Sequence, residues 1–487
     1  MHMKIKTILL LLTASVSCVK AEVSLPHVLG DNMVLQRGQP VPVWGWAAAG
    51  EKITVEFAGQ RRTVVTSDSG KWEVRLRSLK ASAQPAELKI SGANQITLTN
   101  ILVGEVWLCS GQSNMEKPLG TKPGQRPTQN YLQELAGGNC PQIRLFRVEP
   151  AMAREPVKDV NSAWHVCSSN SLELTKFSAV GYFFAREIQK ELNVPIGLVE
   201  SSWGGTRIEP WTPPVGFASV PKIAGLASQI PGTNQPANTR PLVIYNAMIA
   251  PLVPFAVRGA LWYQGESNCM GEHPDGAIYT DKMAALINGW RKLWVQDKLP
   301  VYYVQIAPFH YFQSAKPRVP TVETLPEFWE AQTRALRIPD TGMAVITDLV
   351  DNLNDIHPTQ KKEVGQRLAF LALAKTYGQR RVVCEGPMFR SAKFEKGRSV
   401  VSFNHADGGL VKKGGDALTW FTVAGADGNF VAAEAKIDGS KVIISAASVA
   451  EPKAVRFAWN ESAQPNLFNG AGLPANPFRT GTPSINP

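Results

Sequence analysis

The spacing of hydrophobic positions changes twice along the chain. From about residue 22 to residue 100 apolar and polar positions alternate, as at 52–57 and again at Trp72, Val74 and Leu76. A period of two between turn residues is typical of strands with one buried face. This first region is therefore predicted to be a small β-sandwich domain.

Between about residues 101 and 379 the period switches repeatedly between that of a strand and that of a helix. Such alternation predicts an α/β domain with a parallel sheet. Apolar runs indicate strands near 105–108, 193–199, 259–261, 301–306 and 343–347, and helical spacing indicates helices near 180–188, 283–293 and 359–377.

From about residue 380 to residue 487 the pattern returns to short strands. The runs 433–437 and 442–445 flank Asp438-Gly439, a dipeptide that favours a hairpin turn. The last region is predicted to be a β-rich domain.

The first 21 residues have the pattern of an export signal. Lys4 and Lys6 precede the apolar run 8–16, and small residues lie near the expected cleavage position before Glu22. The run is too short to cross a membrane, and no later stretch is long and apolar enough for a transmembrane helix. We expect export to the periplasm or the extracellular space. Lipid attachment at Cys18 is the alternative to cleavage after residue 21.

Composition indicates an ordinary globular protein of two or three domains. The chain has 487 residues, of which 44% are hydrophobic and 19% charged. Removing the three leader lysines from the net charge of +11 leaves +8. Because the basic residues are spread along the chain in short doublets, a solvated surface is predicted and not a nucleic-acid groove. Acidic glycans are compatible partners.

Five cysteines remain after the leader, and their spacing is wide. Because no Cys-x-x-Cys pair occurs, the sequence indicates neither a zinc site nor a dense disulfide framework. One or two bridges are compatible with this number, and the connectivity stays open. The five are Cys109, Cys140, Cys167, Cys269 and Cys384.

The tetrad Gly111-Gln112-Ser113-Asn114 follows a predicted strand and is a candidate nucleophile turn. A serine hydroxyl needs a base within hydrogen-bond reach and backbone donors for the oxyanion. A glycine two positions earlier allows a sharp turn after the strand. Taken alone, the tetrad is more often an ordinary polar turn.

Two further polar clusters follow predicted strands. The first contains Gly204-Gly205, whose backbone can approach a ligand closely and expose N–H groups. The second contains Gln264, whose amide can donate to an oxyanion, and Glu266, which we interpret as a buried acid that orders the loop. In open parallel sheets, ligands bind at the carboxyl ends of strands, so these positions are informative.

Among seven histidines, His357 has the context expected of a general base. It follows the predicted strand 343–347, precedes a predicted helix, and has Asp348, Asp351 and Asp355 nearby. The other histidines lie in the leader, in the flanking β regions or in loops without an acidic partner after a strand.

Together these clusters resemble the SGNH hydrolase superfamily, and within it the sialate O-acetylesterase family. Glycine-X-serine-X-glycine is absent, which argues against the ordinary α/β-hydrolase arrangement. The residues that carry the resemblance are Gly111-Gln112-Ser113-Asn114-Met115, Trp203-Gly204-Gly205-Thr206, Tyr245-Asn246-Ala247-Met248-Ile249, Trp262-Tyr263-Gln264-Gly265-Glu266-Ser267-Asn268 and Asp355-Ile356-His357-Pro358.

The resemblance implies a flavodoxin-like three-layer α/β/α hydrolase domain flanked by the two β regions. It implies that Ser113 is the nucleophile and His357 the general base and acid. The oxyanion hole would combine the backbone N–H of Ser113, that of Gly205 or its neighbour Gly204, and the Gln264 side chain. Asn114 and Glu266 would support the site.

The orienting acid departs from the pattern of the superfamily. Many SGNH enzymes have an aspartate three residues before the histidine, where this chain has Asn354. Asp355 is therefore the candidate third member, and a backbone carbonyl is the alternative.

The implied reaction is acetyl-ester hydrolysis through an acetyl-enzyme, with no metal or organic cofactor. O-acetylated sialic acid is the expected substrate, and acetylated xylan or another plant glycan is the alternative. Arg207 can pair with a substrate carboxylate, although a structural ion pair with Glu209 is favoured. A secreted carbohydrate-binding protein without activity is the alternative from another functional class.

Overall fold

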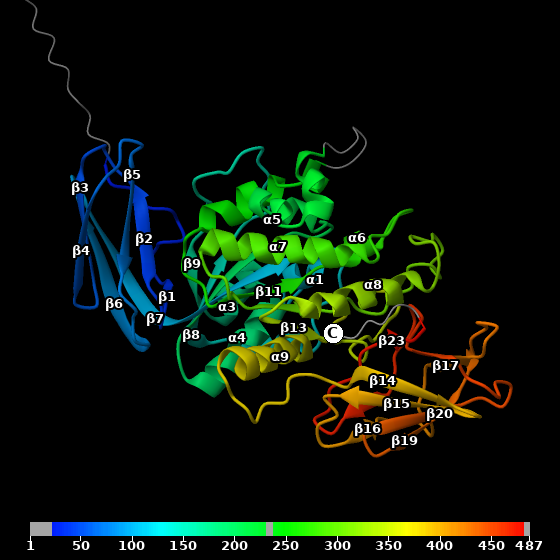
Figure 1. Cartoon of the computed structure of the whole chain (residues 1–487). Coiled ribbons are helices and arrows are strands. Elements are labelled where there is room, and N and C mark those ends of the chain that lie inside the picture. The colour runs from blue at the N-terminus through cyan, green and yellow to red at the C-terminus, as the bar shows by residue number, and fades with distance from the viewer. Residues whose placement is uncertain (1–21, 230–236, 482–487) are drawn as a thin grey trace, which may run out of the picture.

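The computed structural model describes residues 22–229 and 237–481. The predicted leader and Cys18 lie outside the described residues. Figure 1 shows a β-sheet region coloured blue at one end, a central α/β region, and a second β region coloured orange to red at the other end. No helix in the described ranges has the length and apolar character needed to cross a bilayer.

The N-terminal region is built from two small sheets. Strand β5 has the predicted alternation, because Trp72, Val74 and Leu76 are buried and the residues between them are exposed. The strands are β1 (Val34–Gln36), β2 (Val41–Trp46), β3 (Lys52–Phe57), β4 (Gln60–Val65), β5 (Lys71–Leu76), β6 (Ser82–Ser91) and β7 (Gln95–Gly111).

Strand β7 belongs to both the N-terminal and the central region. Its first half pairs with β6, and its second half runs through the middle of the central sheet. The predicted domain boundary between residues 100 and 101 therefore falls inside one continuous strand. At the junction the buried Glu105 carboxylate accepts hydrogen bonds from Arg37 at 2.6 Å and from Arg258 at 2.7 Å.

The central sheet has the strand order β13-β12-β11-β7-β10-β8-β9, and all neighbours are parallel except β8 and β9. This arrangement confirms the predicted α/β fold with a parallel sheet. The strands are β8 (Cys140–Arg147), β9 (Trp164–Cys167), β10 (Ile196–Ser202), β11 (Gly259–Tyr263), β12 (Val301–Val304) and β13 (Thr341–Ala344).

Helices cover both faces of the sheet, which gives the three layers. Helices α4 and α9 pack on one face, and α7 and α8 pack on the other (Figure 1). The helix predicted over 359–377 begins at Lys361 and continues after Leu371 as a π-helical turn. The main helices are α3 (Ser169–Thr175), α4 (Ala179–Leu192), α5 (Pro214–Ala218), α7 (Ile278–Trp294), α8 (Thr324–Arg334) and α9 (Lys361–Leu371).

The C-terminal region consists of antiparallel sheets, as predicted. The hairpin across Asp438-Gly439 is present, with Ile437 opposite Val442. The longer strands are β14 (Met388–Glu395), β15 (Arg398–Asn404), β17 (Phe421–Ala424), β19 (Glu434–Asp438), β20 (Lys441–Ser445) and β21 (Ala454–Phe457). The region is attached to the central domain through Glu461, which accepts the backbone N–H groups of Phe312 at 2.7 Å and Gln313 at 2.8 Å.

The strand order reverses around β7, which lies between β10 and β11. The carboxyl ends of these three strands meet at one edge of the sheet, where such folds bind their ligands. The three polar clusters identified in the sequence follow these three strands.

The backbone packs so closely at the end of β7 that position 111 requires a glycine. Its φ is +139°, and a Cβ atom there would lie 2.2 Å from the Tyr263 carbonyl oxygen. We expect Gly111→Ala to lower the free energy of unfolding by ~2–4 kcal/mol, because the side chain is both strained and overpacked. Urea denaturation followed by circular dichroism measures this loss.

Gly50→Ala is the matched control, since Gly50 has a φ of +76° and a Cβ atom added there would meet nothing within 4 Å. It should lose only the conformational cost of about 1 kcal/mol. Equal losses in the two variants would contradict the steric explanation.

Candidate active site

Ser113 lies at the start of a short helix directly after β7. The backbone N–H of Gln112 donates to the Tyr263 carbonyl oxygen at 2.9 Å, which ties the turn to β11. Helix α1 (Ser113–Glu116) begins at the serine itself. Because the first N–H groups of a helix have no intrahelical acceptor, the Ser113 amide stays available for a ligand. It has no acceptor elsewhere in the described ranges.

His357 is brought to Ser113 from far along the chain. Its Nε2 atom lies 2.9 Å from the Ser113 hydroxyl oxygen. The imidazole side chain is 16% exposed, so it is shielded but reachable. This is the hydrogen bond that a serine nucleophile and its general base require.

Asp355 holds the histidine loop, but not by a hydrogen bond to the imidazole. Its Oδ1 atom accepts the backbone N–H of His357 at 2.9 Å and lies 3.8 Å from the ring Nδ1. Its Oδ2 atom accepts from Arg126 at 2.8 Å, and Arg126 also binds Asp351. The charge of Asp355 therefore acts on the imidazole at ion-pair distance.

Within the described ranges, neither a backbone carbonyl nor Asn354 is hydrogen-bonded to the imidazole ring of His357. In the part of the chain that the structure describes, no backbone carbonyl binds the Nδ1 atom of His357. Asn354, at the position where the superfamily often has aspartate, is hydrogen-bonded to His310 at 3.0 Å.

The Gly204-Gly205 turn lies against the nucleophile. A Cβ atom on Gly204 would be 3.2 Å from the Ser113 Cβ atom. The Gly204 N–H already donates to the Glu116 carboxylate at 2.9 Å. The Gly205 N–H has no acceptor among residues 22–229 and 237–481, and Gly205 has a φ of +74°. Of the two glycines, Gly205 therefore has the N–H that is free to bind an oxyanion.

Gln264, the expected side-chain donor of the oxyanion hole, has internal hydrogen-bond partners for its whole amide group. It is fully buried, and its amide nitrogen donates to the side chains of Gln112 at 3.1 Å and Asn268 at 2.7 Å. Its amide oxygen accepts from the Tyr279 hydroxyl at 2.8 Å. Since both amide protons have internal acceptors, Gln264 braces the turn beneath the nucleophile.

Asn114 joins the serine helix to the histidine loop. Its amide nitrogen donates to Glu266 at 2.5 Å and to the carbonyl oxygen of Ile356 at 3.0 Å. Its amide oxygen accepts from the Lys361 ammonium at 2.7 Å. Because Ile356 immediately precedes His357, this network fixes the distance between His357 and Ser113.

Glu266 supports this network from a fully buried position. Burial raises the pKa of its carboxyl group. Its second oxygen, Oε2, has no hydrogen-bond partner in the described structure. This placement agrees with the interpretation of Glu266 as an acid that orders the loop.

Lys361 is a part of the site that the sequence did not reveal. It is completely buried, and burial lowers its pKa to about 7. The pKa of His357 is lowered to about 4, first by burial and then by the charges of Lys361 and Lys117. The imidazole is therefore neutral, and able to accept a proton, at neutral pH.

Arg207 has the structural role that the sequence favoured. Its guanidinium lies 3.4 Å from Glu209 and 2.7 Å from Asp275, and it also donates to the Ser267 carbonyl at 2.9 Å. These internal partners connect the Gly204-Gly205 turn to the Gln264 loop.

Comparison with known proteins identifies the family of this chain. Residues 103–374 match the family described as "Carbohydrate esterase, sialic acid-specific acetylesterase". The chain belongs to this family. It is therefore a carbohydrate esterase, and this replaces the alternative of a binding protein without activity.

Relatives from mammals and bacteria align over most of this esterase. The sialate O-acetylesterase of Homo sapiens is 30% identical over 391 residues, covering 74% of this chain and 72% of the human protein. That of Mus musculus is 29% identical and covers 74% of each chain. The crystal structure of a carbohydrate acetylesterase from Xanthomonas citri is 37% identical, with a TM-score of 0.84, over 95% of this chain and 100% of that one.

The lowered pKa of His357 predicts how activity depends on pH. Only the neutral imidazole accepts the serine proton, so kcat/KM should fall on acidification near pH 4 and not near 6.5. In Lys361→Gln the loss of the buried positive charge should raise the pKa of His357 and move this acidic limb to higher pH. Rates with 4-nitrophenyl acetate across the pH range measure the limb.

Lys362→Gln is the control, because Lys362 is exposed and binds Glu134 at 2.8 Å. Its profile should match that of the wild type. A Lys361→Gln profile with an unmoved acidic limb would show that the buried charge does not act on His357.

The distance between Asp355 and the imidazole predicts a moderate contribution to the rate. We expect Asp355→Asn to lower kcat/KM about 10-fold, because the loop contact survives while the charge that stabilises the imidazolium is lost. Asp351→Asn, which also removes a partner of Arg126 but does not touch His357, should stay near wild type. A wild-type rate for Asp355→Asn would show that the charge of Asp355 does not contribute to the reaction.

Proposed function

We propose that this carbohydrate esterase is an exported sialate O-acetylesterase that uses Ser113 as its nucleophile. The observation that supports the mechanism is the 2.9 Å contact between the Ser113 hydroxyl and the His357 Nε2 atom. The substrate assignment rests on the relatives named sialate O-acetylesterase.

Catalysis would proceed by two acyl transfers. His357 Nε2 takes the Ser113 proton as the hydroxyl oxygen attacks the acetyl carbonyl. The oxyanion that forms is stabilised by the backbone N–H groups of Ser113 and Gly205. His357 then protonates the departing sugar hydroxyl, and it later activates the water that releases acetate from the serine.

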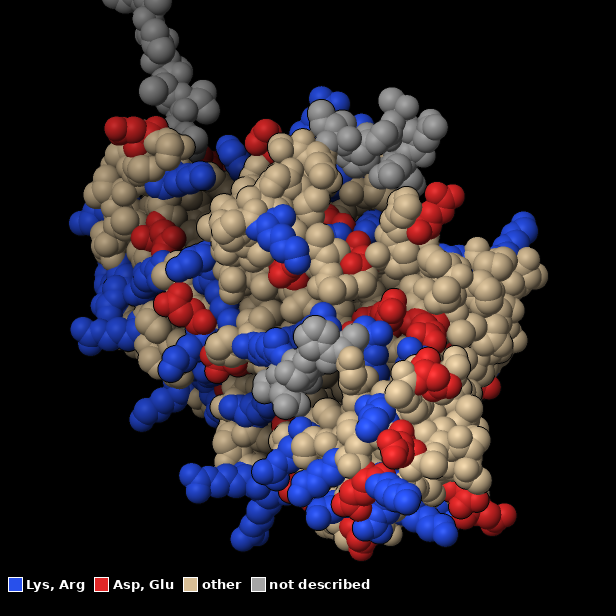
Figure 2. Space-filling model, turned by 45° about the vertical axis from the view of Figure 1, so that its right-hand side comes forward, with Lys and Arg blue, Asp and Glu red and all other residues tan. Residues whose placement is uncertain are grey.

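The charges near the site are compatible with an acidic sugar. Lys122 is partly exposed and lies 2.8 Å from Glu116, the residue that also binds the Gly204 N–H. Figure 2 shows basic side chains spread among acidic ones on the face that it draws. Such mixed charges are compatible with a substrate that carries a carboxylate.

A neutral acetylated glycan such as xylan is the second candidate substrate. It is compatible with the Xanthomonas citri protein, which is similar over nearly the whole chain and whose name, carbohydrate acetylesterase, does not specify the sugar.

Export is proposed on the sequence of residues 1–21 alone. The leader is either removed after residue 21 or cleaved before a lipid-modified Cys18. Mass spectrometry of the protein purified from its native host distinguishes the two products.

The nucleophile is tested by Ser113→Ala. Removing the hydroxyl should lower kcat for 4-nitrophenyl acetate at least ~10³-fold, since the remaining site cannot form the acetyl-enzyme. Circular dichroism should show an unchanged fold. Substantial remaining turnover by folded protein would overturn the assignment.

The substrate is tested with the wild-type enzyme on two natural esters. Acetate release from O-acetylated sialic acid should exceed that from acetylated xylan in kcat/KM. The opposite order would replace the sialate assignment with a plant-glycan one while leaving the serine mechanism intact.

A further inference from the structure

Two cysteines lie opposite each other at the edge of the central sheet. Cys140 is the first residue of β8, Cys167 is the last residue of β9, and the two are direct partners in this antiparallel pair. Opposed residues in such a pair have Cα atoms ~4.5–5.5 Å apart. That separation lies within the range of disulfide bonds, ~4.4–6.8 Å. Both cysteines are thiols in the structure.

The two thiols differ in how they are placed to react. Cys167 is buried, and its thiol lies 3.5 Å from the Gly138 carbonyl oxygen. Cys140 is half-buried, and a hydrogen bond from Cys167, with a further contribution from Arg186, lowers its pKa. A lowered pKa increases the thiolate fraction, which is the reactive form.

The remaining cysteines lack these properties. Cys109 and Cys269 are fully buried, and burial raises the pKa of each thiol. Burial also raises the pKa of Cys384, to about 11. Among the described cysteines, Cys140 is thus the one whose lowered pKa and partial exposure favour nucleophilic attack on a disulfide.

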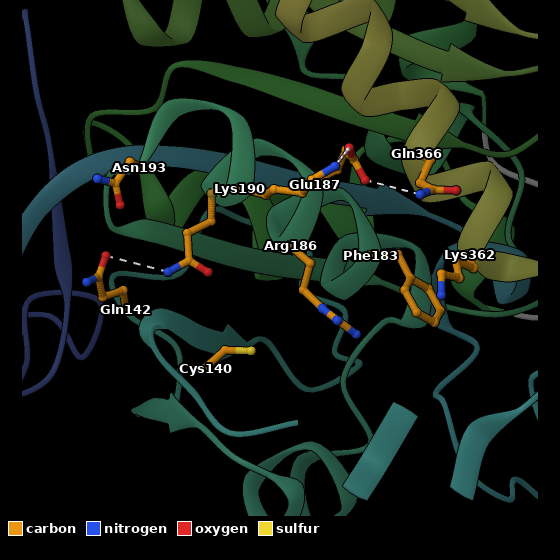
Figure 3. A pocket seen from close by; sticks show the side chains of 10 residues that line it. Cys140, Gln142, Phe183, Arg186, Glu187, Lys190, Asn193, Lys362 and Gln366 are labelled. Carbon is orange, nitrogen blue, oxygen red and sulfur yellow. Dashed lines mark hydrogen bonds and ion pairs between the residues drawn. The ribbon is translucent and has the colours of Figure 1, made fainter. Parts of the chain in front are cut away.

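Cys140 opens into a cavity of about 470 Å³. In Figure 3 the cavity lies between β8 and the helices α4 and α9, with Cys140 facing Arg186. Lys190 and Lys362 also line it, and each cation of the lining is ion-paired: Arg186 and Lys362 with Glu134, and Lys190 with Glu187 and Glu191. The cavity is therefore polar, and its size suits a small polar molecule.

We propose that Cys140 and Cys167 form a redox-active thiol pair, which closes to a disulfide by exchange with a small disulfide admitted through this cavity. The chemical class is that of oxidised glutathione.

The exchange has two steps. The Cys140 thiolate attacks one sulfur of oxidised glutathione, forms a mixed disulfide and releases one glutathione thiolate. Cys167 passes its proton to the released glutathione thiolate, attacks the Cys140 sulfur and releases the second glutathione. The two protein thiols are oxidised to one disulfide, and one glutathione disulfide is reduced to two thiols.

The pairing is tested on the reduced, folded, full-length protein. After incubation with oxidised glutathione, the free thiols are alkylated with iodoacetamide, and peptides are mapped by mass spectrometry without reduction. We expect the peptide that contains Cys140 to be linked to the one that contains Cys167. Wild-type protein in which both cysteines remain alkylated, or in which Cys140 keeps a glutathione without any linked peptide, would overturn the proposal.

Two variants separate the roles of the thiols. Cys167→Ser should trap one glutathione on Cys140, because the second step is blocked. Cys140→Ser should leave Cys167 unmodified, because Cys167 is buried. Glutathione on Cys167 in the second variant would contradict the order of attack. Near-ultraviolet circular dichroism checks that both variants are folded.

None of these measurements uses ester hydrolysis, so their outcome is independent of the proposed esterase substrate.

Discussion

The parallel pairing of β7 with β10 and β11 determines where the chemistry of this protein can occur. This pairing brings the carboxyl ends of three strands to one edge of the sheet, at the point where the strand order reverses. Gly111 allows the closest of these contacts, because the backbone of β11 occupies the space that a side chain would need. The nucleophile, the glycine turn and the Gln264 loop then lie together, although they are separated by long stretches of sequence.

The site combines exposed reactive atoms with a buried polar support. Ser113 and His357 are partly accessible, whereas Asn114, Glu266 and Lys361 behind them are buried. Burying charged groups is costly unless they are hydrogen-bonded to one another. Here the hydrogen bonds of Asn114 connect the acid, the lysine and the histidine loop, so the same contacts give each of these buried groups a partner and hold Ser113 close to His357. Burial, and then the charge of Lys361, lower the pKa of His357.

Several sequence-based expectations differ from the structure for identifiable physical reasons. Gln264 has the residue type of an oxyanion donor, but its amide is saturated by Gln112 and Asn268, which the sequence does not place next to it. Gly204 and Gly205 look equivalent in the sequence, yet the Glu116 carboxylate occupies only the first amide. The sequence did not indicate that Lys361 belongs to the site, because a lysine at the start of a helix is ordinarily exposed.

The sequence by itself determined the α/β class, the β regions on both sides, and Ser113 and His357 as candidates, because periodicity and local turn chemistry are short-range properties. It also identified the family through motifs that each lie within a few residues. Only the tertiary structure decided which amide is free, how far Asp355 lies from the imidazole, and that Cys140 is opposite Cys167. Those features depend on distances between segments that are remote in the chain, and they are set by strand register and side-chain packing in the folded protein.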